Sequence, residues 1–161
     1  MDKDILSLRQ YAWDYFLAHA QARLATFRFY LFYCSIIMAG LFAVLSKGEV
    51  LWIGAALSFL LTFISWVYLR VDIRHKQIIK RAQEALMDIE SMLDLPDQDG
   101  GPNKLKLFSR EKFITSTMPR FPKSLSPKAH CSYSTSICMV FYLFITLGLV
   151  GGFGIIISIC F

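Results

Sequence analysis

Three long stretches of this sequence contain no charged residue, and they restrict the possible folds more than any other feature. They cover residues 29–46, 51–69 and 131–161, which is 18, 19 and 31 residues. The hydrocarbon core of a bilayer, roughly 30 Å thick, is crossed by about 20 helical residues. Helices buried in a soluble bundle usually keep a polar stripe, and the first two stretches are apolar nearly all round. We therefore predict an all-α integral membrane protein with three transmembrane helices.

The basic residues are distributed unevenly around these stretches. Of the 17 Lys and Arg residues, four lie before residue 29 and 12 lie between residues 70 and 130, which leaves Lys47 alone between the first two spans. Cytoplasmic loops of membrane proteins carry an excess of Lys and Arg. This rule predicts a multi-pass membrane protein with a cytoplasmic N-terminus and a C-terminus on the opposite side of the membrane.

Helix breakers divide the rest of the chain. No Gly or Pro occurs before Gly40, and none occurs between Gly54 and Pro96, so both of the first two spans are expected to continue into the cytoplasm as helices. An apolar stripe is expected on the second extension, at Val71, Ile78, Ala82, Ala85, Ile89 and Leu93. The predicted organisation is a cytoplasmic helix (1–28), a transmembrane hairpin (29–69, with spans 29–46 and 51–69), a cytoplasmic amphipathic helix (70–95), a basic loop-rich segment (96–130) and a third span (131–161).

The sequence offers little for catalysis. The three histidines are scattered, the four cysteines have no CxxC spacing, and no phosphate-binding or nucleophile motif occurs outside a membrane span. The expectation is a protein that is not an enzyme and that has neither a metal site nor a cofactor. The cysteines are expected to be small packing residues.

Small and hydroxyl-bearing residues recur at helical spacing within the spans, whereas the spans contain no Asp, Glu, Lys, Arg or His. In lipid such residues mark faces where helices approach one another. One interpretation is that these faces pack the three helices together. The other is that surplus faces meet further copies of the chain around a weakly selective pore, because a specific transporter would need charges or broken helices inside the membrane. The pore or helix-contact candidates are Gly54, Ser58, Thr62, Ser65, Thr135, Tyr142, Thr146, Gly148 and Gly152.

The basic cytoplasmic residues allow two interpretations. They could fix the topology and attract anionic membrane lipid. They could instead bind the phosphates of a nucleotide or oligonucleotide, with Phe108, Phe113 or Phe121 stacking on bases. The candidates for phosphate binding are Arg74, Lys76, Lys80, Arg81, Lys104, Lys106, Arg110 and Lys112.

Two segments carry a family resemblance: "YFLAHAQARLATFRFYLFY" (15–33), which leads into the hairpin, and "LRVDIRHKQIIKRAQEALMDIE" (69–90). Together they resemble the small membrane effectors of bacterial anti-phage systems, including SLATT-type domains and the Hailong-type and retron-associated effectors. The resemblance covers roughly residues 10–95 and includes Asp72, Arg74, Glu84, Leu86 and Glu90. The third span is an addition to the plain two-span pattern.

The resemblance implies a location in the bacterial inner membrane, with the N-terminus in the cytoplasm and the C-terminus in the periplasm. It implies a latent pore that opens on a cytoplasmic signal, depolarises the membrane and stops growth of the infected cell. It also implies a homo-oligomer, for which a tetramer is our expectation, and a nucleotidyltransferase or reverse transcriptase as partner. The competing hypothesis is a membrane anchor that conducts nothing and recruits a soluble partner through its cytoplasmic helices.

Overall fold

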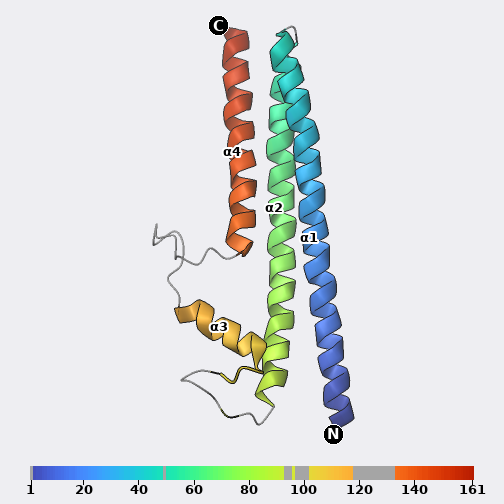
Figure 1. Ribbon diagram of the computed structural model, residues 1–161. Helices are drawn as coiled ribbons and strands as arrows, with labels where there is room; N and C mark the ends of the chain where they lie inside the picture. Colours follow the sequence, from blue (N-terminus) through green and yellow to red (C-terminus); the bar gives the residue numbers. More distant parts are fainter. Residues whose placement is uncertain (1, 49, 93–95, 97–101, 118–132) are drawn as a thin grey trace. The chain divides into compact units, whose positions relative to one another are not determined.

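The computed structural model describes residues 2–48, 50–92, 96, 102–117 and 133–161. These residues form four helices, α1 (Asp2–Lys47), α2 (Leu51–Ser91), α3 (Leu107–Thr117) and α4 (Tyr133–Cys160), and no strand (Figure 1). Among them, α1, α2 and α4 are long and apolar enough to cross a membrane. The predicted all-helical fold with three candidate spans is therefore confirmed.

The turn between α1 and α2 is set by a glycine. Gly48 has a φ of 71°, in the left-handed region where a side chain would be strained, and its N–H donates to the Val44 carbonyl at 3.1 Å. This ends α1 at Lys47. The chain then reverses, and the N–H of Ile53 donates to the carbonyl of Val50 in the first turn of α2.

The chain divides into two compact units. The apolar unit comprises Ala22–Arg74 and Ser134–Phe161, and the charged unit comprises Met1–Gln21 and His75–Tyr133. Helices α1 and α2 contribute to both. The apolar unit therefore begins before the predicted span 29–46 and extends past the predicted span 51–69, which brings several charged residues into it.

The core of the apolar unit is an aromatic cluster between α1, α2 and α4. Tyr30, Leu61 and Phe141 are fully buried in it, together with Cys34. The Tyr30 and Phe141 rings lie 4.6 Å apart, which is close ring contact. A smaller cluster nearer the turn joins Leu41, Ala55 and Ile155. These contacts place α4 beside the α1–α2 hairpin, as Figure 1 also shows.

In the charged unit, α3 packs against α1 through one aromatic side chain. The ring of Phe108 meets the rings of Trp13 at 6.3 Å and Phe16 at 5.6 Å, both edge to face. On α2 the buried residues are Ala82 and Leu86.

The predicted apolar stripe on the second half of α2 is therefore partly wrong. Ala85 and Val71 are exposed, whereas Leu86 is buried. The buried row runs through Ala82 and Leu86, one helical turn apart, so α2 is rotated slightly relative to the expected face. Leu93 lies outside the described residues.

Candidate functional site

Helices α2 and α4 cross at very short range in the apolar unit, because α4 carries glycines at the crossing. A Cβ added at Gly148 would lie 2.6 Å from the Ser58 carbonyl oxygen and would also collide with the Thr62 hydroxyl. One turn further, a Cβ at Gly152 would lie 3.1 Å from the Phe59 ring. Small residues permit such close backbone approach in membranes. Gly148 and Gly152 thus act within one chain, as helix-contact residues.

A polar row follows the face of α2 that looks into the bundle. It consists of Ser58, Ser65 and Asp72, spaced by seven residues, and their exposed fractions are 0%, 0% and 4%. Ser65 donates its hydroxyl to the Leu61 carbonyl at 2.7 Å, and Tyr30 of α1 donates to Ser65 at 3.0 Å. The Ser58 hydroxyl is buried without a hydrogen-bond partner among the described residues. Buried hydroxyls of this kind normally find a partner.

The row ends at a buried ion pair between Asp72 and Arg23. We call this pair, together with Ser134, the charge triad. Arg23 of α1 donates from Nε to Asp72 Oδ1 at 2.6 Å and from Nη2 to Asp72 Oδ2 at 2.9 Å. The same Nη2 also donates to the Ser134 hydroxyl of α4 at 3.3 Å. The two charged side chains are only 11% and 4% exposed. The charge triad therefore joins all three long helices at a single point.

The predicted residues of the spans divide into two sets. Gly54, Ser58, Ser65, Gly148 and Gly152 are buried between helices of the same chain. Thr62 and Thr135 are half-buried, whereas Tyr142 and Thr146 are exposed on α4. Thr146 donates its hydroxyl to carbonyls of its own helix, at Tyr142 and Leu143. Its hydroxyl is therefore satisfied within α4.

In the charged unit, a carboxylate of α2 anchors the start of α3. Glu90 accepts hydrogen bonds from the backbone N–H groups of Phe108 and Ser109 at 3.1 and 3.0 Å, and from the Ser109 hydroxyl at 2.9 Å. The first N–H groups of a helix have no partner within it, and a negative charge there is favourable. Glu90 thus serves as an N-cap supplied from another helix.

Replacing Glu90 with Ala should loosen α3 from α2. The loss of an N-cap side chain costs about 1 kcal/mol, so hydrogen exchange at the first amides of α3 should accelerate roughly fivefold. The matched control is Glu111→Ala, which removes an exposed carboxylate within α3 itself. Equal exchange in the wild-type chain and the Glu90 variant would show that the cap does not hold α3 in place.

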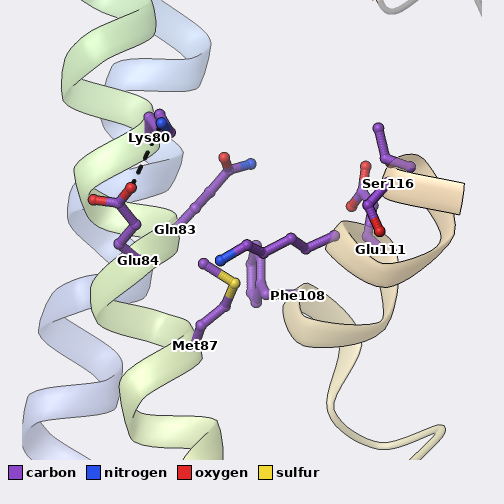
Figure 2. Close-up of a pocket in the computed structure, with 9 residues that line it drawn as sticks. Lys80, Gln83, Glu84, Met87, Phe108, Glu111 and Ser116 are labelled. Carbon is purple, nitrogen blue, oxygen red and sulfur yellow. Dashed lines mark ion pairs between the residues drawn. The ribbon is translucent and has the colours of Figure 1, made fainter. Parts of the chain in front are cut away.

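A pocket of about 420 Å³ lies between α2 and α3. Lys80, Gln83, Glu84 and Met87 line it from α2. Figure 2 shows Gln83 and Met87 extending toward α3, with the Phe108 ring facing them. Lys80 and Glu84 form an ion pair at 3.8 Å, with both side chains well exposed. Lys112 and Glu111 add one charge of each sign from α3. The pocket therefore offers charges of both signs and an aromatic ring, without a net positive charge.

The structure brings together only part of the predicted phosphate-binding set. Lys80 and Lys112 share the pocket between α2 and α3. Lys76, Arg81 and Lys104 are exposed elsewhere in the charged unit, and Lys106 and Arg110 are half-buried near the start of α3. Arg74 belongs to the apolar unit. Phe121, one of the three proposed stacking residues, lies outside the described residues.

Sequence reasoning missed the charge triad because Arg23 and Asp72 both lie outside the uncharged stretches. One signal was available. Asp72 follows Ser58 and Ser65 at the same seven-residue spacing, and residues at this spacing share a helix face. That spacing placed a carboxylate on the face that was expected to contact other helices.

Comparison with known proteins gives one informative likeness. The chain is 28% identical over 113 residues to CD-NTase-associated protein 19 of Escherichia coli, and the match covers 66% of this chain and 75% of that protein. No protein-family model matches the chain, and no solved structure does. The likeness suggests a role in bacterial anti-phage defence.

Proposed function

We propose that this chain is the membrane effector of a bacterial anti-phage defence system, and that copies of it assemble into a gated ion-conducting pore. The defence role is supported by the likeness to a protein named for its association with a CD-NTase. That name also favours a nucleotidyltransferase over a reverse transcriptase as the enzymatic partner. Opening of the pore would depolarise the inner membrane and stop growth of the infected cell.

The pore hypothesis depends chiefly on the outer face of α4. Tyr142 is 58% exposed and lies one turn from the exposed Thr146, so both hydroxyl-bearing side chains lie on the exposed face of α4 among the described residues. Polar side chains on a membrane helix usually face other helices or a water-filled cavity. A ring of copies, for which we favour a tetramer, would direct these two residues toward a common axis. Hydroxyls without charges would give weak ion selectivity.

The pocket between α2 and α3 is our candidate for the site of the signal. Lys80 and Lys112 can neutralise phosphate, and Phe108 offers a ring for base stacking. A nucleotide would suit the pocket better than a long oligonucleotide, because Glu84 and Glu111 limit the number of phosphates that it can accept. The ligand would then bind beside the cap at Glu90 and could change how α3 is held.

The alternative function is a membrane anchor that recruits a soluble partner and conducts nothing. It is favoured by one observation in the charged unit. Leu6, Leu105 and Leu107 are 61%, 72% and 68% exposed, and they line a cavity of about 400 Å³ between α1, α2 and the segment before α3. Exposed apolar patches commonly mark interaction sites between proteins.

Expression of the chain in bacteria should separate the two functions. With the wild-type sequence we expect the signal of a potential-sensitive dye to collapse and growth to stop. The variants Thr146→Leu and Tyr142→Leu should each weaken the depolarisation, because they replace hydroxyls with apolar groups on the proposed pore wall. The measurement is dye fluorescence at matched levels of inserted protein.

The matched control is Met139→Leu, which keeps an apolar side chain on the same face of α4 and should depolarise like the wild type. An inserted wild-type chain that leaves the potential unchanged at high expression would contradict the pore. Retained growth arrest in the Thr146→Leu and Tyr142→Leu variants, without any depolarisation in the wild type, would favour the anchor.

A further inference from the structure

The charge triad occupies an unusual position in the apolar unit. Arg23 and Asp72 lie 49 residues apart in the sequence, yet they form two short hydrogen bonds, at 2.6 and 2.9 Å, between α1 and α2. The third contact, from Arg23 to Ser134, reaches the second residue of α4. The start of α4 is thus tied to the hairpin by a hydrogen bond to a charged group.

A buried ion pair differs from an apolar contact in how it responds to water. Its electrostatic attraction is largely offset by the hydration that both charges lose on burial. The closed pair and the separated, hydrated pair therefore have similar free energies. An apolar contact of the same size has no comparable hydrated alternative and would favour the closed arrangement in all conditions. A buried pair is consequently suited to an element that has to open and close.

The packing of α4 leaves its start as the part that can separate from the hairpin. Phe141 and the Gly148 crossing hold the middle of α4 against α2, whereas the Ser134 contact, at 3.3 Å, is the longest of the three hydrogen bonds in the triad. Opening at this end would uncover the Asp72 carboxylate and the part of the polar row next to it, toward Ser65. Water would then meet hydroxyls rather than a purely apolar wall.

We propose that the Arg23–Asp72–Ser134 triad is the latch that holds the effector in its non-conducting state, and that its separation frees α4 during opening. The inference rests on the proposed pore function and identifies the element that regulates it. Neutralising one charged partner leaves the other buried and unpaired, which disfavours the closed arrangement. Replacing both charges with apolar groups removes the favourable hydration of the separated pair, so the three helices should stay in the closed arrangement.

The test uses the full-length chain reconstituted in liposomes, with potassium release as the readout. Asp72→Asn and Arg23→Gln should each raise the leak rate by about tenfold or more relative to the wild type, because a lone buried charge is strongly unfavourable. Ser134→Ala should raise it about threefold, the usual effect of one hydrogen bond between membrane helices. The double variant R23M/D72L should be as tight as the wild type in liposomes and should fail to depolarise cells on expression.

A second readout reports opening without any ion flow. Cys34 is buried in the same cluster as Ile137 and Phe141 of α4. The experiment uses a chain in which the other three cysteines are replaced by Ala, so that Cys34 is the thiol that reacts. A maleimide should label Cys34 faster in the Asp72→Asn variant than in the wild type, and slowest in R23M/D72L. The matched control is Asp14→Asn, which makes the same substitution at an exposed carboxylate of α1 and should change neither leak nor labelling.

The outcomes separate the latch from the pore. If the wild type depolarises cells but folded Asp72→Asn matches it in leak and labelling, the latch is wrong and the pore stands. Faster labelling of Asp72→Asn with no conduction in any variant supports the latch and rejects the pore. If Asp72→Asn is not recovered in a folded form, unchanged leak and labelling in Ser134→Ala overturn the latch, as does a double variant that leaks.

Discussion

Replacing Gly148 with Ala should destabilise the apolar unit, and replacing Gly154 with Ala should not. The added methyl at position 148 would lie 2.6 Å from a backbone oxygen of α2, a separation that only movement of the whole helix could relieve. Overpacking of this kind costs typically about 1–3 kcal/mol and at times more. That exceeds the roughly 0.5–1 kcal/mol by which Ala is favoured over Gly within a helix.

Gly154 provides the matched control on the same helix. A Cβ at this position would meet nothing within 4 Å, so only the favourable backbone effect remains and the variant should be slightly more stable. Gly152→Ala should fall between the two, because the Phe59 ring 3.1 Å away can rotate or shift. The measurement is the free energy of unfolding in mixed detergent micelles. A Gly148 variant as stable as the wild type would mean that α2 and α4 do not cross this closely.

The three spans could be predicted from the sequence because lipid excludes charge, and an uncharged stretch of sufficient length is recognisable by itself. The importance of Gly148 and Gly152 was also visible, because their four-residue spacing places them on one face. The sequence could not say which helix they contact. That depends on the relative rotation of α2 and α4, which is decided by the fit of side chains such as Phe59 and Phe141.

The charge triad and α3 were harder to predict, for different reasons. Arg23 and Asp72 belong to segments that look like ordinary charged helix extensions, and only the tertiary fold pairs them across 49 residues. Helix α3 has no strong apolar periodicity of its own, and its first N–H groups are satisfied by Glu90, 18 residues upstream of Phe108. Interactions of this kind depend on contacts between helices and leave no local pattern in the sequence.

Replacing Phe141 with Ala should produce the second large loss of stability. Its side chain is 1% exposed, and its ring lies 4.6 Å from the Tyr30 ring and 6.0 Å from the Phe27 ring. In water, a buried Phe→Ala change costs about 3–5 kcal/mol. Part of that cost comes from transfer out of water, and this part disappears when the separated helices are solvated by lipid or detergent. The cavity and the lost ring contacts remain, so we expect a loss of about 2–3 kcal/mol.

The control for this prediction removes the same atoms from a position facing outward. Phe42 on α1 is 77% exposed, and Phe42→Ala should leave the free energy of unfolding in mixed micelles nearly unchanged. Tyr30→Phe keeps the ring and loses the hydroxyl that bonds to Ser65; a hydrogen bond between membrane helices is worth about 0.6 kcal/mol on average. If Phe141→Ala and Phe42→Ala had equal effects, the aromatic cluster could not be what holds α4 against the hairpin, and the Gly148 crossing would have to do so alone.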